Sequence, residues 1–79
     1  MKLLHLKEGT IAVISKITGG NGMAARMAGL GLYEGKKVRI IQAAPFRGPL
    51  LVEDILTGTR TMIGRGIASH VEIRDEEAR

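Results

Sequence analysis

The sequence predicts a mainly β fold: a small closed or half-closed barrel of five short strands, with one short α-helix between the first two strands and a 3₁₀ turn before the last. Three observations lead to this prediction. Runs rich in β-branched residues alternate with turns that contain glycine or proline along the chain. Only one segment has helical periodicity. The 79 residues suffice for one domain, and closing the sheet removes edges that would otherwise aggregate.

The strands are expected where these runs are bounded by turn residues. In the first run Ile11, Val13 and Ile17 share a face. Pro45 and Pro49 mark a hairpin loop between the second and third strands. The strands are predicted at residues 10–18, 36–44, 50–56, 59–63 and 70–74, with the 3₁₀ turn at 64–68 and a charged, frayed tail at 75–79.

The helix is expected over residues 23–30. Asn21 can cap its start, and Gly31 can take the left-handed backbone conformation at its end. Its larger apolar side chains recur at i, i+4 and i+7, so they share one face, which we expect to be buried: Met23, Met27 and Leu30.

Composition limits the possible functions. Cysteine is absent, which excludes disulfides, thiolate metal sites and a thiol nucleophile. No run approaches the roughly 18 apolar residues of a membrane span, so we expect a soluble, cytoplasmic, single-domain protein over residues 1–79. The net charge of +4 is uneven, since residues 1–44 hold seven Lys/Arg and two acids, and residues 45–79 hold five and six. A basic half can meet an acidic protein, an anionic membrane or a phosphate backbone, or simply keep the protein soluble.

Several short motifs follow one another in a distinctive order: Leu6-x-x-Gly9, Ile17-x-Gly19-Gly20, Leu30-Gly31-Leu32-x-x-Gly35, Ala44-Pro45-x-x-x-Pro49-Leu50, Gly58 and Val71-x-Ile73. In this order and spacing the chain resembles the ferrous iron transport protein A (FeoA) family over nearly its whole length. It departs from the family pattern before the last strand, where Gly64-Arg65-Gly66-Ile67 replaces a segment that is often polar and rich in acids.

The resemblance implies an SH3-like β-barrel and a non-enzymatic cytosolic accessory protein of Fe(II) uptake. Such a protein would dock on the cytosolic part of the FeoB membrane transporter, which carries a G-domain, and modulate transport or the GTPase cycle. Membrane association would then go through that partner only. A similar barrel forms the C-terminal domain of iron-dependent repressors. No helix-turn-helix or metal-sensing domain precedes it here, so we interpret the chain as a free-standing module. Transition-metal binding is associated with the family, and a weak homo-oligomer is left open.

The residues themselves favour contact with a partner protein. Phe46 lies beside Arg47 in the proline-rich hairpin loop, and an exposed aromatic next to arginine is typical of an interface anchor. Alternatively, Phe46 folds back and plugs one mouth of the barrel. If the helix lies at the barrel rim, Met23 and Met27 are partly exposed and adaptable to a partner, with Arg26 in solvent. These five residues are the predicted partner contacts.

No catalytic site, metal site or cofactor is predicted. His5 and His70 are the only histidines and lie far apart in sequence, whereas a metal site needs three or four converging ligands. With the acidic tail, His70 would form at most a weak surface or dimer-bridging site. Glu53 and Asp54 alternate across a strand, so their carboxylates point to opposite faces. The glycine-rich turn at 19–22 lacks the Lys-Ser/Thr pair of a phosphate loop.

A nucleic-acid-binding barrel of the ribosomal KOW type is the rival interpretation. The sequence Glu8-Gly9-x-Ile11-x-Val13-Ile14, followed by a glycine-rich turn, has a similar rhythm. The positive charges are spread along the chain, and one Phe, one Tyr and no Trp leave little for bases to stack on. We therefore expect no nucleic-acid partner.

Overall fold

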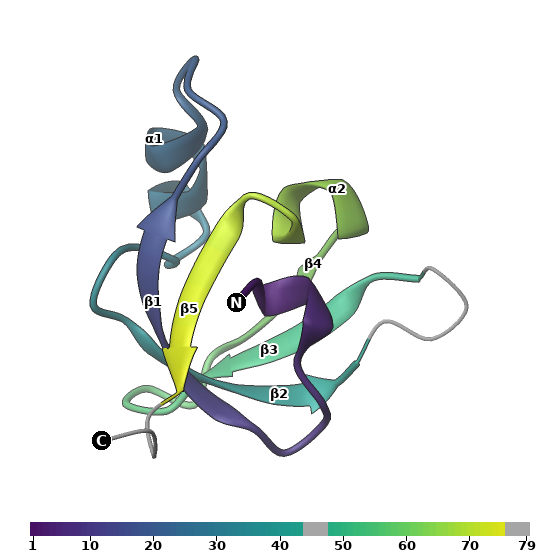
Figure 1. The fold of residues 1–79 in the computed structure, drawn as a ribbon. Coiled ribbons are helices and arrows are strands. Elements are labelled where there is room, and N and C mark those ends of the chain that lie inside the picture. The colour runs from purple at the N-terminus through teal and green to yellow at the C-terminus, as the bar shows by residue number, and fades with distance from the viewer. Residues whose placement is uncertain (44–47, 76–79) are drawn as a thin grey trace.

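The computed structural model describes residues 1–43 and 48–75. These residues form one five-stranded antiparallel sheet in the order β4-β3-β2-β1-β5. The sheet coils around a single core (Figure 1). The strands are β1 (Ile11–Ile17), β2 (Lys37–Gln42), β3 (Leu50–Asp54), β4 (Arg60–Ile63) and β5 (Val71–Asp75). The helical elements are the 3₁₀ helix η1 (Leu3–His5) and the α-helices α1 (Met23–Gly29) and α2 (Arg65–Ala68).

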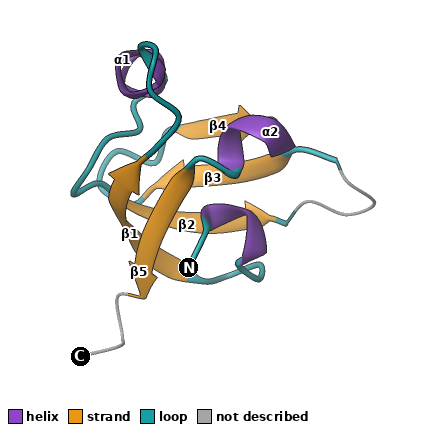
Figure 2. Ribbon diagram, turned by 45° about the horizontal axis from the view of Figure 1, so that its top comes forward, coloured by secondary structure: helices purple, strands orange, loops and turns teal. Residues whose placement is uncertain are grey.

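The barrel is half-closed, because β4 and β5 are the two edges of the sheet. The α2 turn links these edges along the chain, and η1 contacts both α2 and β5 (Figure 2). The outer edge of β5 is covered by the N-terminus, since the Ile73 N–H donates to the Met1 carbonyl at 2.8 Å and Lys2 bridges to Glu72. Sequence reasoning did not find η1, because three residues carry no measurable period.

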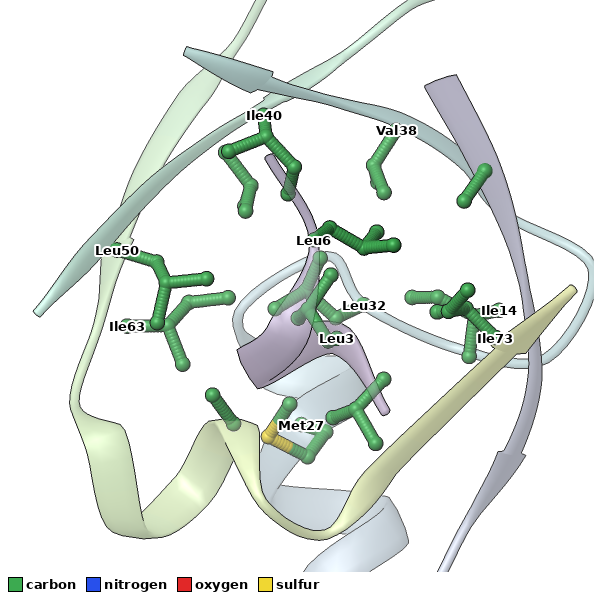
Figure 3. Packing of buried hydrophobic residues seen from close by; sticks show 14 residues of the cluster. Leu3, Leu6, Ile14, Met27, Leu32, Val38, Ile40, Leu50, Ile63 and Ile73 are labelled. Atoms are coloured by element: carbon green, nitrogen blue, oxygen red, sulfur yellow. The ribbon is translucent and has the colours of Figure 1, made fainter. Parts of the chain in front are cut away.

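Buried aliphatic side chains from every element fill the barrel (Figure 3). Leu3 from η1 and Met27 from α1 meet the strand residues Leu50, Ile63 and others, and each of these four is fully buried. Burying a side chain of this size contributes roughly 1.5–3 kcal/mol relative to leaving it exposed. The two helical elements are therefore held mainly by what they bury.

The predicted common face of Ile11, Val13 and Ile17 is not kept in β1, where Val13 is buried but Ile17 is the one that packs against the core cluster. Ala12 and Ile14 are fully buried, whereas Ile11 and Ile17 are only half-buried. A register shift between Ile14 and Lys16 in the pairing with β5 interrupts the simple alternation of faces. Such a bulge cannot be read from the period-2 pattern that the prediction used.

The start of α1 also differs from the prediction. Gly22, not Asn21, is the N-cap, and no side chain caps the helix. Asn21 itself has φ +49°, within a left-handed turn that leads into the helix, which begins at Met23 as expected. At the other end Gly31 takes φ +83°, as predicted. The helix stops at Gly29, so Leu30 lies beyond its last turn.

The turn before β5 is a single α-helical turn where a 3₁₀ turn was expected. Ala68 and Ser69 donate to the carbonyls four residues earlier, at 2.9 and 3.1 Å. Only the last bond, from His70 N–H to the Ile67 carbonyl at 2.9 Å, is of the 3₁₀ type. Ala68 is fully buried, and this anchor favours the wider turn. Asp75 was expected in the tail, but it pairs with Ala12 at the end of β5.

Candidate protein-interaction surface

Large apolar side chains are exposed where the segment after α1 meets the β3–β4 hairpin. Leu30 is 42% exposed, Tyr33 49% and Leu56 88%. A groove of about 420 Å³ runs between Tyr33 and Leu56, and a second of about 230 Å³ borders Leu30. Asp54 lines both grooves, so they adjoin. We call these three side chains with their two grooves the hairpin-end surface.

An ion pair forms the floor of the hairpin-end surface. Lys36 Nζ lies 2.5 Å from Asp54 Oδ2, and the two side chains are only 11% and 15% exposed. The Tyr33 ring covers Lys36, with its centroid 4.9 Å from Nζ. The pair therefore ties the start of β2 to the end of β3.

The protonation equilibria of this pair reflect the contact. The hydrogen bond from Lys36 lowers the pKa of the Asp54 carboxyl, and the Leu56 and Thr57 N–H groups add to the effect. The hydrogen bond to Asp54 raises the pKa of the Lys36 ammonium, and Tyr33 contributes in the same direction. In both groups the charged form is the favoured one.

The same carboxylate fixes the position of Leu56. Asp54 Oδ1 accepts the Leu56 N–H at 2.8 Å and the Thr57 N–H at 3.3 Å. The Gly58 N–H donates to the Asp54 carbonyl at 2.7 Å, which closes the turn. Leu56 is therefore held in solvent on an ordered turn, and a binding partner would lose little conformational entropy by capturing it.

The structure describes three of the five predicted partner contacts, and these three differ in burial. Arg26 is exposed on α1, and Met23 is half-buried against the core. Met27 is fully buried, so its assignment to a partner surface is wrong: the helix packs this side chain into the barrel interior. Phe46 and Arg47 lie outside the described residues.

Sequence reasoning missed all three side chains of the hairpin-end surface. Leu30 was assigned to the buried face of the helix, which in fact ends one residue earlier. Tyr33 and Leu56 were passed over, although each carried a signal. Tyr33 is the only tyrosine, and Leu56 is a large apolar residue next to the turn residues Thr57-Gly58. Nothing in the local pattern places the two side chains on one groove.

Metal ligands are not clustered in the part of the chain that the structure describes, where no group of three or more His, Cys, Asp or Glu comes together. His70 contacts Thr18, whose Oγ1 lies 3.4 Å from the ring Nδ1. Within the same residues, no helix is both long enough and apolar enough to cross a membrane.

The fold defines the class of protein: a small antiparallel barrel of the SH3-like type. The crystal structure of an iron uptake regulatory protein (FeoA) shares it with a TM-score of 0.81 at 24% identity, covering 94% of this chain and 93% of that one. The solution structure of the FeoA protein from Chlorobium tepidum gives 0.83 at 25% identity, covering 100% and 73%. A manganese-dependent transcriptional repressor gives 0.84 at 18% identity, covering 95% of this chain but 36% of that one.

Sequence comparison then gives the family. The model of the FeoA domain matches residues 1–75. An Fe(2+) transport protein A from Methanocaldococcus jannaschii is 31% identical over 75 residues, covering 95% of this chain and 87% of that protein. The chain belongs to the FeoA family, which is involved in Fe(II) transport. The resemblance inferred from the ordered motifs and the SH3-like barrel that it implied are both confirmed.

Proposed function

We propose that this chain is a non-enzymatic cytoplasmic accessory protein of Fe(II) uptake, which binds the cytosolic part of the FeoB transporter and modulates transport or its GTPase cycle. Family membership supports the link to Fe(II) transport. The observation that carries the binding role is the hairpin-end surface, where Leu30, Tyr33 and Leu56 stand exposed around adjoining grooves. Apolar side chains held in solvent around a concave surface are typical of protein-interaction sites.

The proposed contact surface extends from the β3–β4 hairpin to α1. Arg26 is exposed on α1, and Leu30 follows four residues later at the end of the helix. An exposed arginine beside an apolar patch suits a partner with acidic groups around an apolar contact. Met23 would lie at the margin, since it is half-buried. Phe46 and Arg47 stay proposed contacts on the basis of sequence alone.

Co-purification tests this function. The cytosolic part of FeoB is immobilised and offered the wild-type chain, the Arg26→Glu variant and the double variant Phe46→Ala/Arg47→Glu. We expect the wild type to be retained, Arg26→Glu to be weakened by charge reversal, and the double variant to be lost while its circular dichroism is unchanged. A wild-type chain that is not retained would contradict the proposed partner. Retention of the double variant would remove Phe46 and Arg47 from the proposed contact surface.

The nucleic-acid alternative is favoured by the similar barrel in a transcriptional repressor. The net charge of +4 points the same way. Against it, Arg39 and Arg60 on the sheet both lie beside Glu53, at 3.6 and 3.3 Å, which reduces the charge available to phosphates. Binding of a DNA or RNA oligonucleotide with a steep dependence on salt would favour this alternative, and absence of binding at low salt would dismiss it.

A further inference from the structure

We propose that two copies of this chain pair through the outer edge of β4, antiparallel and centred on Thr61, so that one sheet continues into the other across a twofold axis. This goes beyond the proposed function, because it uses the backbone edge of β4 and a different partner, although Thr61 also lines the second groove of the hairpin-end surface. It follows from the edges of the sheet, the hydrogen-bonding phase of β4 and the charges along it.

The two edges of the sheet differ in how they are covered. The outer side of β5 is occupied by the N-terminus through the bond from the Ile73 N–H to the Met1 carbonyl. No residue of the described chain pairs with the outer side of β4, which is the other edge. An edge strand left in this state is a template for a further strand.

The hydrogen bonds of the hairpin show which groups of β4 face outward. Antiparallel pairs alternate between those that exchange both backbone bonds and those that exchange none. The Asp54 N–H donates to the Thr59 carbonyl at 2.8 Å, so the next bonded pair along the ladder is Val52 with Thr61. Arg60 lies between the bonded residues Thr59 and Thr61, and Met62 follows Thr61. These two residues therefore direct their N–H and C=O groups away from β3. The free edge offers two donors and two acceptors.

Only one register lets all four outward-facing groups of each copy form hydrogen bonds with the other copy. With Thr61 opposite its own copy, Arg60 of each chain faces Met62 of the other, and both outward pairs can exchange two hydrogen bonds. Centring on Arg60 would place two guanidinium groups opposite each other, which is unfavourable. Centring on Met62 would leave Arg60 opposite Gly64, which lies beyond the end of the strand. The strand is thus self-complementary about Thr61.

The side chains fit the same register. Arg60 and Met62 lie on the outer face of the sheet and are both exposed, Met62 to 57%. The Arg60 guanidinium is held by Glu53 at 3.3 Å, which limits repulsion between the two copies and leaves the arginine stem to cover the methionine opposite. Thr61 facing Thr61 is a favourable cross-strand pair. A strand of four residues predicts a weak, concentration-dependent dimer.

Charge variants at one position test the register by sedimentation equilibrium over a concentration series. Met62→Glu places a carboxylate opposite Arg60 of the other copy, and Met62→Lys places a second cation there. We expect the dimer dissociation constant to fall by about tenfold for Glu and to rise by about tenfold for Lys, because two symmetry-related pairs change at once. Met62→Gln is the uncharged control and should stay near the wild type. The contrast between Glu and Lys should shrink at high salt.

A backbone variant tests the edge itself. Met62→Pro removes an N–H that points away from β3, so it should abolish the dimer while the circular dichroism and the unfolding midpoint are nearly retained. If this variant fails to fold, the contrast between Met62→Glu and Met62→Lys still tests the proposed register. A wild-type chain that stays monomeric at millimolar concentration, or Glu and Lys variants that shift the equilibrium in the same direction, would overturn the proposal. So would a monomeric wild type whose capture by FeoB is lost in Met62→Pro, since the edge would then take a strand of the partner.

Discussion

The Asp54 carboxylate accepts a hydrogen bond from Lys36 and two from the backbone of its own turn, so one side chain joins two segments that are distant in sequence. Its pKa is lowered from the ordinary value of 3.8, and the pKa of Lys36 is raised from 10.5. The carboxylate therefore stabilises the fold above pH 3.8, and this contribution is lost as the pH falls through the lower folded-state pKa. The ammonium contributes below pH 10.5 and loses its contribution as the pH rises through its higher value.

Substitution at Asp54 separates these roles. Asp54→Asn keeps an oxygen that can accept the Leu56 N–H but removes the charge, whereas Asp54→Ala removes both. We expect the free energy of unfolding to fall for Asn and to fall further for Ala. Below about pH 4 the loss of stability on acidification should be smaller in both variants than in the wild type. Urea unfolding across this pH range measures the free energy of unfolding of each variant. Identical pH profiles for the wild type and Asp54→Asn would show that the ion pair does not stabilise the fold.

Gly19 lies where a side chain would meet His70. Its φ is +102°, and a Cβ there would come within 3.1 Å of the His70 Nδ1. Gly20 also has a positive φ, +57°, but a Cβ there would have open space around it. Gly20→Ala should lower stability by about 1 kcal/mol through backbone strain alone, and Gly19→Ala by about 2–3 kcal/mol because the contact is added. Equal losses in urea unfolding would show that the ring moves aside freely.

Sequence reasoning at this scale succeeded where the cause is local. The left-handed conformation of Gly31 follows from its place after a helical pattern. The Asn21 cap was wrong because Gly20, Asn21 and Gly22 all take positive φ, which makes Gly22 the N-cap. The Lys36–Asp54 pair could not be predicted, because its partners are brought together only by the register of β2 with β3.

At the scale of elements, α1 depends on one buried side chain. Met27 is fully buried, whereas Met23 is half-buried and Leu30 is exposed. Met27→Ala should therefore lower the free energy of unfolding by about 2–5 kcal/mol. Met23→Ala, four residues earlier on the same helix, should lower the free energy of unfolding by about 1 kcal/mol. Chemical denaturation of both variants provides the measurement, and equal losses would mean that α1 is not anchored through Met27.

The ends of the strands could be predicted where turn residues mark them. Each strand was expected within two residues of its observed ends, because glycine and proline punctuate the chain. The position of Ile17 could not be predicted, since the bulge after Ile14 that turns it to the face of Ala12 and Ile14 depends on the pairing with β5. The single turn at 64–68 was expected, but its α-type bonding follows from the burial of Ala68, which is a tertiary effect.

At the scale of the whole molecule, the barrel brings the segment after α1 against the β3–β4 hairpin and exposes apolar side chains from both. Leu30 and Tyr33 are more than 20 residues from Leu56 in sequence, so no local pattern indicates their common surface. The fold class and family were accessible from motif order, whereas this surface required the structure. Thr61 lines the second groove, but Met62 lines neither, so substitutions at Met62 can test the pairing of two copies separately from binding of a transporter.

We propose that the hairpin-end surface binds the cytosolic part of FeoB. Titration calorimetry of that part with the wild-type chain and with the double variant Tyr33→Ser/Leu56→Ser tests it most directly, with Met62→Gln as a control at another exposed apolar site. We expect wild type and control to bind alike, with a negative heat-capacity change, and the double variant to bind at least about tenfold more weakly at unchanged fold. Equal affinity of the double variant and the wild type would contradict the account.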